Sequence, residues 1–364
     1  MVVHVLTAER YHLVPGIVKG FLTAYANDTE HRFLLLGTEK LDESLYENIF
    51  QEKSFTDYSF IYSKRQLIKA LWLNRHNAIL MHGEKYLYLI IIVSFLFGNT
   101  NINWVCWGSA AKINRSGKSK LFTPFKLFLY HRLSSINTLM EDDRKTIMED
   151  FSISPEIINT IPYASGGDLN IRDQACQRIR KEPAPSHQDK TRVLLGNNTG
   201  NIPYYHELID KLASFKGNVE VHCMLNYSLD KDTEYDRLVE HGKSVFNQDF
   251  ILDEDFHSDP EDFIRYMNYY DVYICGNPAQ TGLGALYTIL QLGKKIYVTG
   301  KNYSWLREGL NTIVYEIKEI GSYEDFIKSL TEDEKNQNND NILNYKKQSP
   351  LMWHKYLNSL NQSK

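Results

Sequence analysis

The loop VLLGNNTGN, residues 193–201, carries residue types that bind phosphate. It leaves an apolar run at Gly196 and continues through Asn197, Asn198 and Thr199 before a helical pattern begins. Small polar residues let backbone N–H groups approach an anion, and the N-terminus of the following helix adds partial positive charge. The loop therefore fits a diphosphate, although an ordinary strand-to-helix turn has the same composition.

A second loop of this kind, GNPAQTGLGAL, lies between two later strand-like runs. Its candidate binding residues are Asn277, Gln280, Thr281, Gly282 and Gly284. The amide and hydroxyl side chains can hydrogen-bond to a sugar or a phosphate, and the first turn of the helix offers backbone donors. The purely structural alternative is that Gly282 and Gly284 only allow a helix to pack closely on a strand. Together with the first loop, this one favours a site for a phosphorylated sugar compound.

Other strand ends carry further candidates. Asn226 and Tyr227 follow a strand-like run in the second half, where a base or a sugar would lie. In the first half, transfer to a hydroxyl group would need a general base, and His12, His82 and Glu84 follow strand-like runs. A single histidine at a strand end is more often structural than catalytic, so each assignment is an individual hypothesis.

The segment KINRSGKSKLFTPFKLFLYHR, residues 112–132, combines lysine, arginine and aromatic residues with no Asp or Glu. Lys118, Lys120 and Lys126 are its candidate contacts with a membrane surface that carries anionic lipids. RNA binding would use a similar pattern, but the acidic balance of the whole chain disfavours it. A core helix preceded by a solvated basic loop is the alternative.

Strands and helices that alternate along the chain must position these loops. In the first half, the pattern predicts strands over 2–7, 31–37, 77–83, 102–108, 135–140 and 157–163, separated by helices over 16–27, 65–75, 85–97, 124–134 and 141–149. In the second half, it predicts strands over 191–197, 219–225, 248–253, 271–276 and 295–300, separated by helices over 204–215, 232–246, 259–270 and 283–293. Such alternation is typical of parallel α/β sheets.

Two sets of this kind predict two domains. We expect an N-terminal Rossmann-like domain over residues 1–165, a polar linker over 166–190 and a C-terminal Rossmann-like domain over 191–344. A polar stretch, DEKNQNNDN, precedes a last helix over 345–364, which Pro350 kinks or delays. The domains are expected to face a central cleft, because ligands of open α/β sheets bind beyond the carboxyl ends of the strands.

Composition excludes several classes. The 364 residues are 43% hydrophobic and 24% charged, and the net charge of −4 argues against a nucleic-acid partner. The opening run MVVHVLT reads as a strand rather than a signal peptide. The longest apolar run, residues 86–98, is shorter than the about 20 residues that span a bilayer. The four cysteines form no CxxC pair and read as buried thiols. We therefore expect a cytoplasmic protein.

Two Rossmann-like domains in one chain match the architecture of GT-B glycosyltransferases. The segments WVCWGSAAK, VLLGNNTGN, MLNY and QTGLGALYTILQLGKKIYV, in this order, resemble the bacterial N-acetylfucosaminyltransferases of enterobacterial common antigen synthesis, the 4-alpha-L-fucosyltransferase family. The shared pattern includes a His-Gly strand end at His82, a Trp-Gly strand end at Trp107, an LLGN turn and a Q-x-G-x-G element that enters an apolar helix. The likeness spans most of the chain through short motifs.

The resemblance implies a GT-B hexosyltransferase. Its donor would be a dTDP-linked 4-acetamido-4,6-dideoxyhexose, and its acceptor a polyprenyl-diphosphate glycan at the cytoplasmic face of the inner membrane, in surface polysaccharide synthesis. The two glycine-bearing loops would hold the donor, while Gly16, His82 and Trp107 would line the acceptor side. No cofactor or metal is implied, because helix N-termini can stabilise a leaving diphosphate. The one short sequence of this chain that superficially matches a DxD metal-binding motif is DED at 253–255.

Two departures, the first from wider GT-B families and the second from the resembling relatives, leave the catalytic base and the exact sugar open. The helix over 283–293 contains Gln291 but no carboxylate, and IWGAD of the relatives reads CWGSA here. Two alternatives stay open beside the transferase. One is a nucleotide-sugar 2-epimerase of the same fold, which would need more carboxylates in the cleft. The other is a non-catalytic protein that binds a sugar nucleotide or a lipid-linked glycan.

Overall fold

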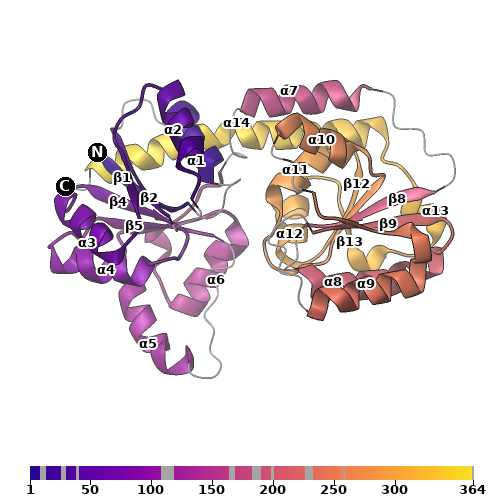
Figure 1. Cartoon of the computed structure of the whole chain (residues 1–364), viewed down its shortest axis with the longest axis horizontal. Coiled ribbons are helices and arrows are strands. Elements are labelled where there is room, and N and C mark those ends of the chain that lie inside the picture. The colour runs from indigo at the N-terminus through magenta and orange to yellow at the C-terminus, as the bar shows by residue number, and fades with distance from the viewer. Residues whose placement is uncertain are drawn as a thin grey trace. The chain divides into compact units, whose positions relative to one another are not determined.

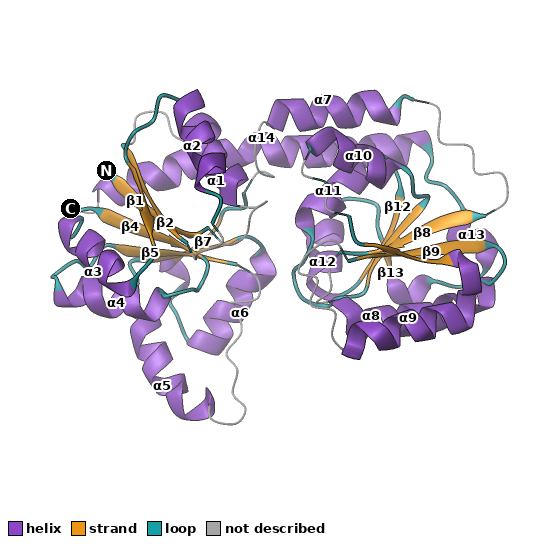
Figure 2. Cartoon of the chain, in the orientation of Figure 1, coloured by secondary structure: helices purple, strands orange, loops and turns teal. Residues whose placement is uncertain are grey.

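The computed structural model describes residues 1–8, 14–25, 30–37, 41–107, 119–163, 169–182, 190–197, 201–225, 233–255, 257 and 259–362. The chain forms two compact units, each with a parallel sheet between helices (Figures 1 and 2). Unit 1 consists of Met1–Leu169 together with Lys346–Lys364, and unit 2 consists of Asn170–Tyr345. The last helix therefore belongs to unit 2 at its start and to unit 1 at its end.

Unit 1 contains a seven-stranded sheet in the order β3-β2-β1-β4-β5-β6-β7, in which every strand pair is parallel. Its strands are β1 (Val2–Thr7), β2 (His31–Leu36), β3 (Tyr58–Ile61), β4 (Ala78–His82), β5 (Ile102–Cys106), β6 (Ser135–Thr138) and β7 (Ile158–Thr160). The central strands β4 and β5 are buried along their whole length, as expected of parallel strands that are covered on both faces.

Helices cover both faces of this sheet (Figure 2). They are α1 (Val14–Gly20), α2 (Glu43–Glu52), α3 (Lys64–Leu73), α4 (Leu87–Leu96), α5 (Ser119–Tyr130), α6 (Glu141–Phe151) and the end of α14 (Glu332–Gln362). Leu67 of α3, Ile90 of α4 and Leu129 of α5 share one core cluster. Phe50 of α2 and Trp353 of α14 share the other cluster. The C-terminal helix thus completes the core of unit 1.

Unit 2 contains a six-stranded parallel sheet in the order β10-β9-β8-β11-β12-β13. Its strands are β8 (Thr191–Leu195), β9 (Val219–Met224), β10 (Phe250–Asp253), β11 (Val272–Cys275), β12 (Lys295–Val298) and β13 (Tyr315–Glu316). Its helices are α7 (Leu169–Arg180), α8 (Ile202–Leu212), α9 (Thr233–Phe246), α10 (Pro260–Asn268), α11 (Leu283–Gln291), α12 (Gly300–Ser304), α13 (Tyr323–Ile327) and the start of α14.

Counted from its own first strand, the sheet of unit 2 has the Rossmann order 3-2-1-4-5-6, and the sheet of unit 1 has the same order followed by a seventh strand. The strand order reverses between β1 and β4 in unit 1 and between β8 and β11 in unit 2. Loops that leave the carboxyl ends of these pairs diverge to opposite faces, and the crevice between them is where such sheets bind ligands. The prediction of two Rossmann-like sheets is confirmed.

Several predicted boundaries were wrong. The polar segment interpreted as a linker contains α7, which buries Ala175, Cys176 and Ile179 against unit 2 because their spacing places them on one helical face. The polar stretch before the last helix is itself helical. Asn338 there accepts from the backbone N–H of Ile313 (2.6 Å) and donates to its carbonyl (3.1 Å). The buried Asn338 thus holds a loop of unit 2, while the other residues of the stretch are at least partly exposed.

Further elements were not predicted, among them α2 and β3. Helix α2 reads as charged and polar, but Tyr46 and Phe50 lie one turn apart and are fully buried. Strand β3 is only a short run that follows a polar turn. The four cysteines are buried and free, which confirms the prediction of unpaired thiols. None of the described helices is both long enough and apolar enough to cross a membrane.

Candidate functional site

The two glycine-bearing loops meet at the strand reversal of unit 2. Strands β8 and β11 are neighbours, with Ile274 opposite Leu195. The first loop therefore leaves β8 at Gly196 beside the second loop, which leaves β11 at Gly276. Residues that are about eighty positions apart in the sequence therefore lie at one edge of the sheet.

Asn197 is the centre of the side-chain network that joins these loops. Its Oδ1 accepts from Asn201 Nδ2 (2.9 Å) and from Thr281 Oγ1 (3.0 Å). Asn277 Nδ2 donates to Asn201 Oδ1 (2.8 Å). Because Asn197 and Asn201 are both almost fully buried, these bonds fix the loops in one relative position.

Two residues of this site were missed by sequence reasoning. Asn201 lies at the end of the first loop, and Asn302 lies in α12, after the next strand β12. Asn302 Nδ2 donates to the carbonyl of Thr281 (3.0 Å), and its Oδ1 accepts from the N–H of Thr281 (3.4 Å). A polar residue just past a strand end was the available signal, and the same criterion applied to β12 would have indicated Asn302.

Gly196 and Gly282 are required by close contacts. Gly282 has φ +64°, and a Cβ atom there would lie 2.7 Å from Cγ of Asn197. A Cβ atom at Gly196 would collide with the ring of Tyr273. Gly284, by contrast, is exposed and has open space beside it. Gly282 thus shapes the network itself, and the open space at Gly284 gives no sign of the close packing proposed as the alternative for these two glycines.

Two helices begin at this edge without a side-chain cap. Helix α8 begins after Asn201 and α11 begins after Gly282, and neither N-cap side chain accepts a hydrogen bond from its helix. The N–H groups of the first turn of α11 can therefore bind an anion, and so can that of Ile202 in α8, where the next residue, Pro203, has no N–H to donate. Gln280 adds a buried Oε1 atom that accepts no hydrogen bond from any described residue. Donors and an unsatisfied amide oxygen together suit a phosphorylated ligand with hydroxyl groups.

Several candidate residues lie outside the described part of the chain. These are His12, Lys118, Asn198, Thr199, Asn226 and Tyr227, together with the side chain of Lys120. Their assigned roles stay predictions. Lys126 is described, lies in α5 and places its Nζ atom 5.5 Å from the ring centre of Tyr88.

The candidates in unit 1 are more dispersed. Gly16 lies within α1, half-buried, and Glu84 is exposed just after β4. Trp107 packs beside Gly83, where φ is +83° and a Cβ atom would lie 3.3 Å from the indole ring. Of the three candidates for the base, His12, His82 and Glu84, only Glu84 is both described and exposed to solvent.

His82 is fully buried in a chain of hydrogen-bonded rings. Its Nε2 lies 3.0 Å from His4 Nδ1, and its Nδ1 hydrogen-bonds to the hydroxyl group of Tyr163. His4 Nε2 in turn lies 2.7 Å from His31 Nδ1. Both ring nitrogens of His82 are therefore occupied, and it would have to break one bond to accept a proton from a substrate. The geometry favours the structural alternative for this histidine.

Burial keeps these three histidines neutral. It lowers the pKa of His82 to about 3. Burial, with a smaller effect of the N-terminal charge, lowers the pKa of His31 to about 4. For His4, burial and then the neighbouring His31 and His82 hold the pKa well below its usual range. His4 and His82 can then each donate one hydrogen bond and accept another, whereas His31 bonds through Nδ1 and its buried Nε2 has no partner among the described residues.

Comparison with solved structures identifies the architecture. The chain aligns over 98% of its length with 98% of a glycosyltransferase from Rickettsia africae (TM-score 0.64, 12% identity). It aligns over its whole length with 99% of the Anabaena protein HepE in complex with UDP and glucose (TM-score 0.69, 12% identity). It also aligns over its whole length with 99% of the lipopolysaccharide outer core galactosyltransferase WaaB (TM-score 0.59, 11% identity).

The chain has the GT-B fold. No family model and no curated protein matches the sequence. At these identities the likeness extends to the fold alone. The finer resemblance to one transferase family therefore stays a proposal.

The DED sequence of this GT-B chain belongs to a structural network in unit 2. Asp253 accepts from Tyr270 (2.5 Å) and Tyr266 (2.9 Å) and lies 3.3 Å from His222 Nδ1. His222 Nε2 lies 2.8 Å from Glu220. Among the described residues, no group of three or more His, Cys, Asp or Glu side chains could hold a metal ion. Whether the protein works without a metal stays a prediction.

This network predicts a pH-dependent contribution to stability. Burial lowers the pKa of His222, but its hydrogen bonds to Asp253 and Glu220 outweigh burial and raise it above the usual value. The stabilisation is complete below the unfolded-state pKa and is lost as pH rises through the raised pKa. We expect Asp253→Asn to cost about 1–3 kcal/mol at pH 6 and less at pH 8. Urea unfolding at both pH values measures this cost.

The matched control for Asp253→Asn is Asp255→Asn, which replaces an exposed carboxylate of the same DED sequence. Asp255→Asn should leave the free energy of unfolding within about 0.5 kcal/mol of wild type. Equal costs of Asp253→Asn at the two pH values would show that the His222 network does not titrate as described.

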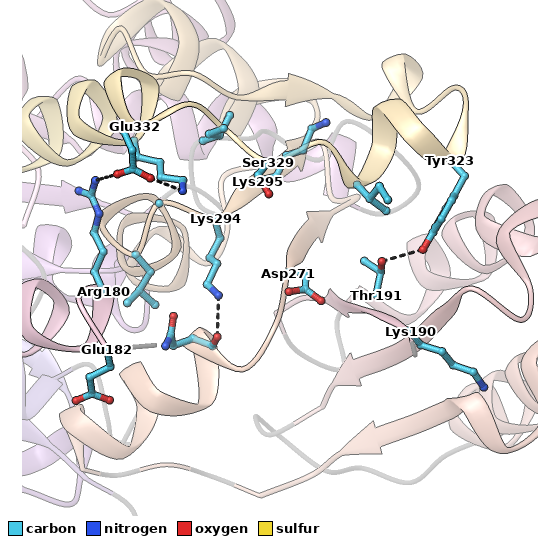
Figure 3. Close-up of a pocket in the computed structure, with 16 residues that line it drawn as sticks. Arg180, Glu182, Lys190, Thr191, Asp271, Lys294, Lys295, Tyr323, Ser329 and Glu332 are labelled. Atoms are coloured by element: carbon cyan, nitrogen blue, oxygen red, sulfur yellow. Dashed lines mark hydrogen bonds and ion pairs between the residues drawn. The ribbon is translucent and has the colours of Figure 1, made fainter. Parts of the chain in front are cut away.

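A separate cavity of about 570 Å³ lies at the opposite edge of the unit 2 sheet (Figure 3). Thr191, Asp271 and Lys295 line it at the amino ends of β8, β11 and β12. In Figure 3, Glu332 pairs with Arg180 (3.7 Å), and Lys294 donates to the backbone carbonyl of Asn268 (2.8 Å). Because GT-B sheets bind ligands at the carboxyl ends of their strands, this cavity is not the candidate site.

Proposed function

We propose that this chain is a glycosyltransferase that binds a nucleotide-sugar donor at the strand reversal of unit 2. The observation that carries the proposal is the Asn197 network, which holds two uncapped helix N-termini at one edge of the sheet. The GT-B fold supports it, since HepE has this fold and its structure contains UDP and glucose.

The described residues would perform three tasks in this reaction. The N-termini of α8 and α11 would bind the donor diphosphate and stabilise the charge that develops on it when the bond to the sugar breaks. Thr281 and Gln280 would contact the sugar or phosphate from the second loop. The acceptor hydroxyl would form the new bond to the sugar and lose its proton to a base, for which Glu84 is the exposed described candidate.

We further propose the finer assignment that the four short motifs favour. The donor would be a dTDP-linked 4-acetamido-4,6-dideoxyhexose, and the acceptor a polyprenyl-diphosphate glycan. Such an acceptor lies in a bilayer, so the enzyme would work at the cytoplasmic face of the inner membrane. The helix over 283–293 contains no carboxylate, and its Gln291 is engaged with Asp173 (3.0 Å). Donor binding by this helix would thus depend on backbone amides rather than on an acidic side chain.

Nucleotide binding is the first test. A nucleoside diphosphate at a hundred times its dissociation constant should raise the free energy of unfolding by about 2.7 kcal/mol. Thermal unfolding with dTDP, UDP and ADP would measure this effect, and the largest shift should identify the base. No shift with any nucleotide at millimolar concentration would refute the donor site. Nucleotide release from a panel of sugar donors, with and without a lipid extract, then distinguishes transfer from simple binding.

A further inference from the structure

Helices α4 and α5 of unit 1 expose large apolar side chains. Ile92, Phe95 and Leu96 form one stripe on α4, and Leu96 retains 75% of its accessible surface. Phe125 and Phe128 form a second stripe on α5, each a little over half exposed. Single exposed apolar residues are common on proteins, but two adjoining stripes are not.

Arg132 joins the two stripes. Its guanidinium carbon lies 5.2 Å from the ring centre of Phe95 and 4.8 Å from that of Phe128. The hydroxyl groups of Tyr88 and Tyr130, 2.8 Å apart, connect the same two helices beneath. The five residues Phe95, Leu96, Phe125, Phe128 and Arg132 therefore form one surface, here called the α4–α5 face.

The three helices that form or adjoin this face carry charge of one sign, although Glu84 is exposed shortly before α4. The sequences of α3, α4 and α5 contain no Asp or Glu, whereas α3 and α5 contain lysine or arginine. Trp72 and Leu73 at the end of α3 are also about half exposed, and Arg75 lies 4.8 Å from the Trp72 ring centre. A cationic, apolar surface of this kind is unexpected on a chain with a net charge of −4.

We propose that the α4–α5 face docks on a membrane surface that contains anionic lipids. Phenylalanine and leucine side chains gain by entering the boundary between head groups and acyl chains. Lysine and arginine beside them are attracted to the negative head groups. The proposal shifts the membrane contact from the lysines predicted from the sequence to a surface made chiefly of aromatic residues and Arg132.

Other occupants fit this face less well. A second copy of the chain related by two-fold symmetry would place the same cationic surface against itself, since such an interface is self-complementary. A nucleic acid would satisfy the cations through its phosphates but would leave Ile92 and Leu96 without apolar partners. A bilayer interface satisfies both kinds of side chain.

This inference deepens the proposed function, on which it rests for the location of the lipid-linked acceptor. It does not involve the donor site. Binding to vesicles can be measured without a nucleotide, a sugar or an acceptor, so failure of the membrane face and failure of the transferase assignment are distinguishable.

The test is cosedimentation with vesicles of phosphatidylcholine, alone or mixed with phosphatidylglycerol. Wild-type protein should bind the anionic vesicles and should bind less at high salt. The double variant Phe95→Ser/Phe128→Ser should reduce the partition coefficient at least about tenfold because two large apolar groups leave the interface. Arg132→Glu should reduce it about tenfold on the anionic vesicles and hardly at all on phosphatidylcholine.

The matched control is Leu351→Ser. It removes from α14 a leucine that is about as exposed as Leu96 of the α4–α5 face. It should bind vesicles like the wild type. Absence of wild-type binding to anionic vesicles would overturn the proposal, and so would unchanged binding of the double variant. A dimer in solution that the double variant dissociates, without loss of vesicle binding, would instead identify a second copy as the occupant. If the double variant does not unfold cooperatively, Arg132→Glu decides the question.

Discussion

The variant Gly282→Ala is expected to bind nucleoside diphosphates roughly a hundredfold more weakly than the wild type. The reason is geometric. Residue 282 has φ +64°, which costs a non-glycine residue about 1–2 kcal/mol. Its Cβ atom would also lie 2.7 Å from Asn197. Displacing Asn197 loosens its bonds from Thr281 and Asn201, each worth about 1 kcal/mol, and moves α11 relative to α8.

Isothermal titration with dTDP and UDP measures this loss. The control is Gly217→Ala, which also places alanine at a positive φ of +88°, but where a Cβ atom meets nothing within 4 Å. Both variants should lose about 1–2 kcal/mol of stability from backbone strain, and Gly282→Ala should lose more because its Cβ atom displaces Asn197. Only Gly282→Ala should lose nucleotide affinity. Wild-type affinity in Gly282→Ala would show that the Asn197 network does not form the binding site.

Unit 1 is expected to lose roughly 5 kcal/mol of stability when the pH falls from about 7 to about 5. His4, His31 and His82 have depressed pKa values because they are buried. In the unfolded chain they titrate near pH 6.5. The unfolded state therefore binds more protons, and stability that is fully present above pH 6.5 is lost as the pH falls towards the folded pKa values. Each histidine contributes about 1.4 kcal/mol per pH unit.

Denaturant unfolding followed by tryptophan fluorescence reports on this effect, because every tryptophan except Trp305 belongs to unit 1. His31→Gln should reduce the pH dependence by about one third, since it removes one of three titrating groups and keeps a hydrogen-bonding partner for His4. His131→Gln, which removes an exposed histidine, should leave it unchanged. A flat stability profile between pH 7 and 5 would contradict the neutral, buried state of this chain of rings.

The two histidine networks thus respond to pH in opposite directions. Acid weakens unit 1 through imidazoles that must be neutral, while a rise in pH weakens the contribution of His222, which is stabilised in its charged form by Asp253 and Glu220. The sequence contains all of these histidines at comparable strand positions, and nothing in their local pattern separates the two groups. The carboxylates opposite His222 come from its own strand and from the neighbouring strand β10.

The sequence by itself determined the class of the fold and the two loops of the candidate site. Strand and helix periodicity is a property of neighbouring residues, so the alternation that produces two parallel sheets can be read directly. The glycines and amides after β8 and β11 were identifiable because their types stand out just past apolar runs. Helices α7 and α2 were missed because their few buried residues are surrounded by polar ones, so no apolar pattern stands out in the sequence.

Only the tertiary structure decided which of these residues act together. The bonds from Asn197 to Asn201 and Thr281 depend on β8 and β11 being neighbours, and strand order is not a local property. The same holds for His82, whose partners His4 and Tyr163 come from distant segments and occupy both of its ring nitrogens. In the sequence, His82 and Asn197 both lie at the end of an apolar run, and this shared position does not distinguish their roles. Their different surroundings in the folded chain make one part of the core and the other the centre of the candidate site.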